Sequence, residues 1–125
     1  MKILKTKNMP KSNGHYSQCI EHNGLLYFSG QLPIDPATKQ IPQTIEAQTV
    51  QVLTNIETLL KEAGSSKSKV LQARIYVSNI DLWNEVDEQY KLFFGAHKPV
   101  RCIIPTRGLH FGCLIEIEVT ATLNN

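Results

Sequence analysis

The clearest periodicity in the chain is helical and begins after a turn-rich segment. Thr44 is a residue type that caps helix N-termini, and Glu46 would complement the helix dipole in the first turn. Gly64 directly follows the last apolar position of the pattern, where glycine commonly ends a helix. The spacing therefore predicts a helix between Thr44 and Gly64, with a buried face of Ile45, Val52, Leu53, Ile56, Leu60 and Ala63.

A shorter helical pattern lies downstream of Asp81, a residue type that can also cap a helix. Pro99 lies beyond its end, and its apolar stripe comprises Leu82, Val86, Tyr90 and Phe93. Since proline cannot continue a helix, this second helix is expected to end before it.

Two segments alternate between apolar and polar residues, as half-buried strands do. In the first, Val70 to Val77, we expect Leu71, Ala73, Ile75 and Val77 on the buried face, opposite Gln72, Arg74 and Tyr76. In the second, Leu114 to Leu123, Ile115, Ile117, Val119 and Ala121 alternate with glutamates and threonines. Shorter strands are expected at 1–6, 17–21, 25–29 and 100–104, and Asn23-Gly24 predicts a hairpin between the second and third of these.

These elements follow the order β-ββ-α-β-α-ββ, which predicts one α+β domain spanning residues 1–125. The economical arrangement packs both helices on one face of a mixed sheet. The opposite face would carry polar residues together with Val70, Tyr76 and Leu114. A face of this mixed character favours partial burial against another copy of the chain.

Composition places the chain among ordinary globular proteins and argues against two classes of partner. Apolar residues make up 42% and charged residues 19%, and 13 basic against 11 acidic side chains give a net charge of +2. No run of Lys or Arg exceeds two neighbours, so nucleic-acid binding is not expected. No stretch reaches the roughly 18 apolar residues of a membrane span, and we expect neither a signal peptide nor a membrane partner.

The cysteines and histidines show no metal-binding spacing. An odd number of cysteines without a CxxC pair favours free thiols in a cytoplasmic protein over a disulfide framework; they are Cys19, Cys102 and Cys113. The histidines are likewise scattered. We therefore expect a cytoplasmic protein without a metal or another cofactor.

Arg101 is the most unusual charge in the chain, because it lies within the apolar run 100–104. An unpaired buried guanidinium is costly, so Arg101 should meet a carboxylate. That carboxylate can belong to the protein or to a ligand, whose two oxygens a planar guanidinium binds together. The pattern alone supports both alternatives equally.

Glu116 and Glu118 lie two residues apart and therefore on one face of the terminal strand. A solvated outer face explains them by itself. A paired-carboxylate site would require Arg101 on the neighbouring strand and on the same face. Cys102 is a candidate nucleophile, but the sequence positions no histidine to activate it.

Six short motifs, in this order and spacing, resemble the RidA/YjgF/L-PSP family from about Tyr16 to Ala121. They are Gly-His-Tyr-Ser-Gln at 14–18, Phe-Ser-Gly-Gln-Leu-Pro at 28–33, Gln48 to Asn55, Tyr90 to Phe94, Pro-Val-Arg-Cys at 99–102 and Ile-Glu-Ile-Glu at 115–118. Each motif is weak alone, but the set is specific. The resemblance implies a chorismate-mutase-like fold and a homotrimer whose three sheets form a central barrel, with a site in each cleft between subunits.

The resemblance also implies an activity: hydrolysis of reactive 2-imino or 2-enamino acids to 2-keto acids and ammonia. In this interpretation Arg101 binds the substrate carboxylate, and Glu116 orients or activates the attacking water. Tyr16 would close over the small-molecule substrate. Ser29, Gly30 and the backbone of Cys102 would line the cleft.

The chain departs from the family pattern at several positions. His15 replaces a proline before Tyr16, Cys102 replaces a serine, and Asp87 stands where asparagine is typical. Retention of Arg101 favours an active enzyme. The alternative is a non-catalytic or regulatory trimer of the same family that binds small carboxylates or carbonyl compounds in its clefts. Ribonuclease or translation-inhibitor functions, attached to some family members, are argued against by the near-neutral charge and the lack of a His/Lys constellation.

Overall fold

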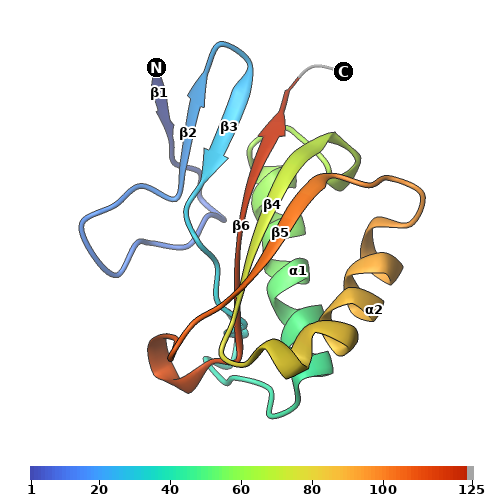
Figure 1. The fold of residues 1–125 in the computed structure, drawn as a ribbon. Coiled ribbons are helices and arrows are strands. Elements are labelled where there is room, and N and C mark those ends of the chain that lie inside the picture. Colours follow the sequence, from blue (N-terminus) through green and yellow to red (C-terminus); the bar gives the residue numbers. More distant parts are fainter. Residues whose placement is uncertain (124–125) are drawn as a thin grey trace.

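The computed structural model, which describes residues 1–123, contains a six-stranded mixed sheet in the order β1-β2-β3-β6-β4-β5. β4 and β5 run parallel, and all other neighbours run antiparallel. Helices α1 and α2 lie together on one side of the sheet (Figure 1), which confirms the predicted layers. The elements are β1 Lys2–Leu4, β2 Cys19–His22, β3 Leu25–Phe28, α1 Ile45–Glu62, β4 Val70–Val77, α2 Trp83–Phe94, β5 Val100–Pro105 and β6 Ile115–Thr122.

Helix α1 begins and ends as the sequence predicts. The Thr44 side chain accepts a hydrogen bond from the Ala47 amide, and Gly64 adopts a positive φ of 84° just past the C-cap. The amide of Ser65 then bonds the Leu60 carbonyl, so backbone groups at the helix end are satisfied. The buried face of α1 forms the centre of the core and also includes two polar residues, Gln48 and Thr49.

Helix α2 differs from its predicted form in two details. A short 3-10 turn, Ile80–Leu82, precedes it, and the Asn79 side chain rather than that of Asp81 caps this turn. Phe94 rather than Phe93 completes the buried stripe, because Val86, Tyr90 and Phe94 follow a strict four-residue spacing. Phe93 lies at the side of this stripe and is only partly buried.

The start of β4 contains a bulge that reverses a predicted assignment. The pairing with β6 shifts register between Val70 and Gln72. Val70 is consequently in the core, while Leu71 is 45% exposed. The prediction had placed Leu71 on the buried face and Val70 on the open face, and both placements were wrong. A bulge adds one residue to a strand and so changes which side chains face inward. Leu114, also expected on the open face, packs against the core instead.

The sheet face away from the helices is polar along β4 and β6 and apolar at the β5 edge. The Tyr76 hydroxyl donates to a Glu118 oxygen at 2.6 Å, and Arg74 donates to Gln72 at 2.9 Å. At the edge, Val100 is 65% exposed and Ile104 is also exposed. Oligomerisation through this face stays a prediction, and the apolar edge favours it. Within residues 1–123, neither helix is long and apolar enough to cross a membrane.

Two amide side chains of α1 hold the irregular segment that joins β3 to the helix. Gln48 donates to the Pro42 carbonyl and accepts from the Leu114 amide, each at 2.8 Å. Asn55 donates to the carbonyls of Leu32 and Ile34 at 3.1 and 2.9 Å. Backbone groups that have no sheet partner are therefore satisfied by helix side chains.

Replacing Gln48 with leucine should destabilise the protein by about 2 kcal/mol, because two partly buried backbone groups lose their partners. Urea unfolding followed by circular dichroism measures this change. Gln51→Leu is the control, since Gln51 bonds only the side chain of Asn55 and should lose less than about 1 kcal/mol. Equal stability of the two variants would contradict the role of Gln48.

Candidate functional site

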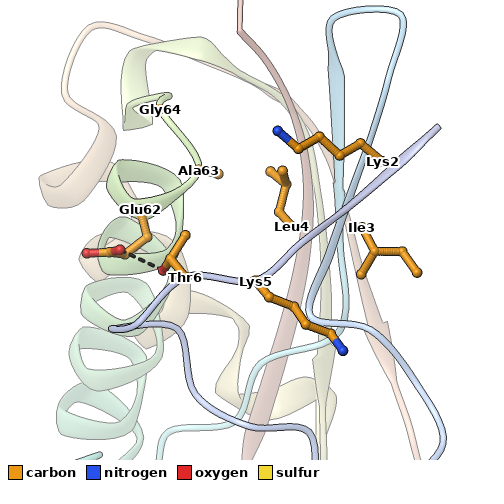
Figure 2. Close-up of a pocket in the computed structure, with 8 residues that line it drawn as sticks. All are labelled: Lys2, Ile3, Leu4, Lys5, Thr6, Glu62, Ala63 and Gly64. Carbon is orange, nitrogen blue, oxygen red and sulfur yellow. Dashed lines mark hydrogen bonds between the residues drawn. The ribbon is translucent and has the colours of Figure 1, made fainter.

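The described residues line a half-open cavity of about 1020 Å³ between the N-terminal loop, the segment after β3 and α1. Its lining includes several polar and aromatic residues, among them Tyr16, Gln18, Gly30, Gln31, His110 and Phe111. A separate hollow of about 650 Å³ lies between β1 and the end of α1 (Figure 2). None of the predicted site residues lines that second hollow, where the Thr6 hydroxyl bonds Glu62 at 2.7 Å.

Gly30 and Glu116 are in direct contact at the edge of the larger cavity. A Cβ at position 30 would collide with a carboxylate oxygen of Glu116 and would lie 3.2 Å from its carboxylate carbon. Hydrogen bonds between the backbones of Gln31 and Ile117, at 2.7 and 3.0 Å, fix the two segments beside each other. Any side chain at position 30 would therefore displace the Glu116 carboxylate from its present place.

The environment of Glu116 disfavours its charge. Partial burial, and then the nearby Glu118 carboxylate, raise the pKa of Glu116 above its ordinary value, while His110 acts in the opposite direction. A carboxylate with a raised pKa accepts a proton more readily than an ordinary glutamate does. Glu116 is thus suited to proton transfer at the cavity edge.

Ser29 and Tyr16 lie near Gly30 but use their polar groups differently. The Ser29 hydroxyl donates to the Ser17 carbonyl at 2.6 Å, so its proton is engaged in holding β3 to the preceding loop. Tyr16 is exposed at the cavity, with its ring against Gly14. The chain therefore brings Tyr16, Ser29, Gly30 and Glu116 together in one region.

Arg101 lies elsewhere, between β5 and α2. Its Nη1 donates to Asp87 Oδ1 at 2.8 Å, and the guanidinium stands 4.8 Å from the ring centre of Tyr90 and 5.5 Å from that of Trp83. Of the two alternatives left open by the sequence, a protein carboxylate does meet Arg101. Its side chain nevertheless remains 22% exposed, and Nη2 and Nε make no hydrogen bond within residues 1–123.

Arg101 and Glu116 do not meet within one chain. β4 separates their strands, and Arg101 is in register with the core residue Ala73 on the helix side of the sheet. The condition for a paired-carboxylate site, Arg101 on the neighbouring strand and on the same face, is therefore not met within one chain. Cys102 is exposed on the opposite face, in register with Arg74.

The sequence analysis named Asp87 and Tyr90 for other reasons but did not place them beside Arg101, and it did not name Trp83. Trp83, Asp87 and Tyr90 occur at spacings of four and three, which places them on one helix face, and this spacing was the available signal. Burial raises the pKa of Tyr90 to about 12, and its hydroxyl has no hydrogen-bond partner within residues 1–123. No group of three or more potential metal ligands occurs in that same range.

Comparison with known proteins gives consistent matches over nearly the whole chain. The family model described as endoribonuclease L-PSP matches residues 6–123. A RutC family protein from Pyrococcus horikoshii is 38% identical over 120 residues, 95% of each chain. The chloroplastic Reactive Intermediate Deaminase A of Arabidopsis thaliana is 35% identical over 97% of this chain and 65% of that protein. The structure of a Rid family protein from Yersinia pestis is 41% identical, with a TM-score of 0.90 over 97% of this chain and 98% of that one.

Gly30→Ala should displace the Glu116 carboxylate while leaving the fold intact. The atom that must move is the end of a flexible side chain, so stability should change by no more than about 1 kcal/mol. Release of the carboxylate toward solvent should lower the pKa of Glu116 toward its ordinary value, as measured by carbon-13 NMR titration. In the control Gly108→Ala, where nothing lies within 4 Å of the new Cβ, the pKa of Glu116 should stay as it is in the parent protein.

Proposed function

The chain belongs to the endoribonuclease L-PSP family, which includes the RidA and YjgF proteins, and on this premise we propose that it hydrolyses 2-imino and 2-enamino acids. The products are 2-keto acids and ammonia. The observation that carries the proposal is the partly buried Glu116 carboxylate, with its raised pKa, held against Gly30 at the edge of the cavity. One relative bearing the name of a reactive intermediate deaminase supports it.

The reaction needs few groups, because an imine carbon is already electrophilic. Nη2 and Nε of Arg101 bind the substrate carboxylate and hold it in place. Glu116 takes a proton from water as the water oxygen bonds to C2. The proton then passes to the nitrogen as the C=N double bond becomes a single bond. Glu116 takes the proton of the new C2 hydroxyl group and transfers it to the nitrogen as the C–N bond breaks, so ammonia leaves while the C2 carbonyl forms. Holding the water and the imine within reach supplies much of the acceleration, and proton transfer by Glu116 adds to it.

The separation of Arg101 from Glu116 supports a site shared between two copies of the chain. The two residues lie on different strands and on opposite sheet faces, so one copy alone cannot apply both to one small substrate. The exposed apolar β5 edge, with Val100 and Ile104, is a surface that a neighbouring copy would cover. A homotrimer with clefts between subunits joins Arg101 of one copy to Glu116 of the next.

The name of the family model describes a ribonuclease, but the charge of this chain does not favour that activity. Its formal net charge is +2 over 125 residues, little for a protein that must neutralise several phosphates. Imine hydrolysis, as proposed, uses the charged groups of Arg101 and Glu116 and needs no extended positive surface.

A coupled assay tests the proposal directly. An amino-acid oxidase generates 2-imino acids in the presence of semicarbazide, which traps them. Adding this protein should reduce the trapped product and release the corresponding 2-keto acid. Trapping that is unchanged while small carboxylates still bind would instead identify a non-catalytic binding protein.

Glu116→Gln should reduce the hydrolysis rate at least about a hundredfold, because the amide cannot accept the proton. In the parent protein, the rate should fall as pH is lowered through the raised pKa of Glu116, above the 4.5 of an ordinary glutamate. Rate measurements across the pH range, made on both proteins, check this expectation.

The same substitution should have the opposite effect on stability. A raised pKa in the folded state means that folding opposes ionisation, so stability falls as pH rises from the ordinary value of 4.5 through the raised one. Glu116→Gln removes this penalty and should melt at a higher temperature than the parent protein at pH 7. A variant that lost both activity and stability would show that Glu116 has a structural role.

Sedimentation at micromolar concentration should give about 42 kDa, three times the 14.1 kDa mass of the chain. Ile104→Lys places a charge on the exposed β5 edge and should produce smaller, inactive species. Leu92→Lys is the control, because Leu92 is 76% exposed on the outer side of α2 and should leave the trimer intact. A fully active monomer would overturn the shared site.

A further inference from the structure

Asp87 places a carboxylate oxygen without a protein partner beside N–H groups of Arg101 that also lack one within residues 1–123. Asp87 Oδ1 accepts from Arg101 Nη1 at 2.8 Å, but Oδ2 accepts no hydrogen bond within residues 1–123. The guanidinium keeps Nη2 and Nε available in the same way. Both side chains remain partly exposed, at 37% for Asp87 and 22% for Arg101, so a ligand can reach them.

The aromatic residues of α2 hold this pair in a fixed arrangement. The guanidinium lies near the rings of Tyr90 and Trp83, at 4.8 and 5.5 Å from their centres. Tyr90 is buried, with its hydroxyl unpartnered among the described residues. Contacts of a cation with aromatic rings orient the guanidinium, so its free N–H groups point in a defined direction.

The charges of the pair determine which ligands it accepts. A simple monoanion that approaches Arg101 also approaches the Asp87 carboxylate, whose repulsion opposes binding. A ligand with a carboxylate and a positively charged nitrogen on the adjacent carbon meets an opposite charge at each end. The protonated form of a 2-imino acid and an α-amino acid both have this pattern, whereas a 2-keto acid lacks the cation.

We propose that Asp87 and Arg101 together recognise a zwitterion, with Arg101 binding the carboxylate and Asp87 Oδ2 accepting from the cationic nitrogen. The cleft then selects protonated iminium substrates over 2-keto acid anions, an extension that rests on the proposed function. Asp87 stabilises the form of the imine that water attacks most readily. It also repels the product once the nitrogen has left, which favours product release.

The test uses two ligands with the same carbon skeleton, 2-aminobutanoate and 2-oxobutanoate, in isothermal titration calorimetry. The parent protein should bind the amino acid roughly tenfold more tightly than the keto acid, a difference of about 1.4 kcal/mol. Asp87→Asn should remove or reverse this preference. Glu88→Gln is the control, because it removes a negative charge from an exposed position on the same helix and should leave the preference unchanged.

Asp87→Glu is a second variant that keeps the charge and should keep the preference for the amino acid, and thermal melts establish that each variant is folded. A preference lost in Asp87→Glu as well as in Asp87→Asn would show that packing rather than charge is responsible. The proposal is overturned by that result, by an unchanged preference in Asp87→Asn, or by a parent protein that binds neither ligand or both equally.

The test of zwitterion recognition and the test of imine hydrolysis can fail independently of each other. A preference that depends on Asp87, in a protein without imine hydrolysis, supports zwitterion recognition and removes the enzymatic proposal. Hydrolysis without such a preference removes only the role of Asp87.

Discussion

The candidate site depends on the hydrogen bonds that two α1 amides make to backbone outside the sheet. Gln48 joins the segment after β3 to the residue just before β6, and Asn55 holds the carbonyls that follow Gln31. Both ends of the Gly30–Glu116 contact are attached to the helix in this way. A buried Gln is costly unless its amide is fully used, and here both its oxygen and its nitrogen have partners. The core helix therefore determines where the Glu116 carboxylate lies.

The close approach at Gly30 places a charge where the fold disfavours it. Burial and a neighbouring glutamate both act against ionisation of Glu116, and neither effect is relieved by a counter-ion as close as the Arg101–Asp87 pair. Such unfavourable environments are common at functional sites, where reactivity is obtained at the expense of stability. On the same sheet face, the hydrogen bond from Tyr76 to Glu118 raises the pKa of Tyr76 to about 12, so the phenol of Tyr76 stays protonated.

Local signals in the sequence were sufficient for the layers of the fold. The caps of α1 and the alternation in β6 depend on residues within a few positions of each other, so both could be recognised from the sequence. The bulge at Val70 could not be recognised in this way. The residue types at 70–72 do not reveal that one residue is left unpaired there, yet that residue changes which side chains face inward.

Most of the arrangement around Arg101 likewise depends on tertiary packing. An isolated basic residue in a short edge strand does not reveal which sheet face it occupies. Its partner, Asp87, is fourteen positions away on another element. The motif resemblance pointed to Arg101 and Glu116 as functional residues, but their separation within one chain became visible only in three dimensions.

A cleft that draws Arg101 from one copy and Glu116 from another would have a genetic consequence. A chain damaged at Arg101 still offers an intact Glu116, and a chain damaged at Glu116 still offers an intact Arg101. In a mixed assembly, one cleft would then combine the intact Arg101 of one chain with the intact Glu116 of the other. Two inactive alleles expressed together would then restore part of the activity that neither provides alone, and this complementation would follow directly from the placement of the two residues on opposite faces of the sheet.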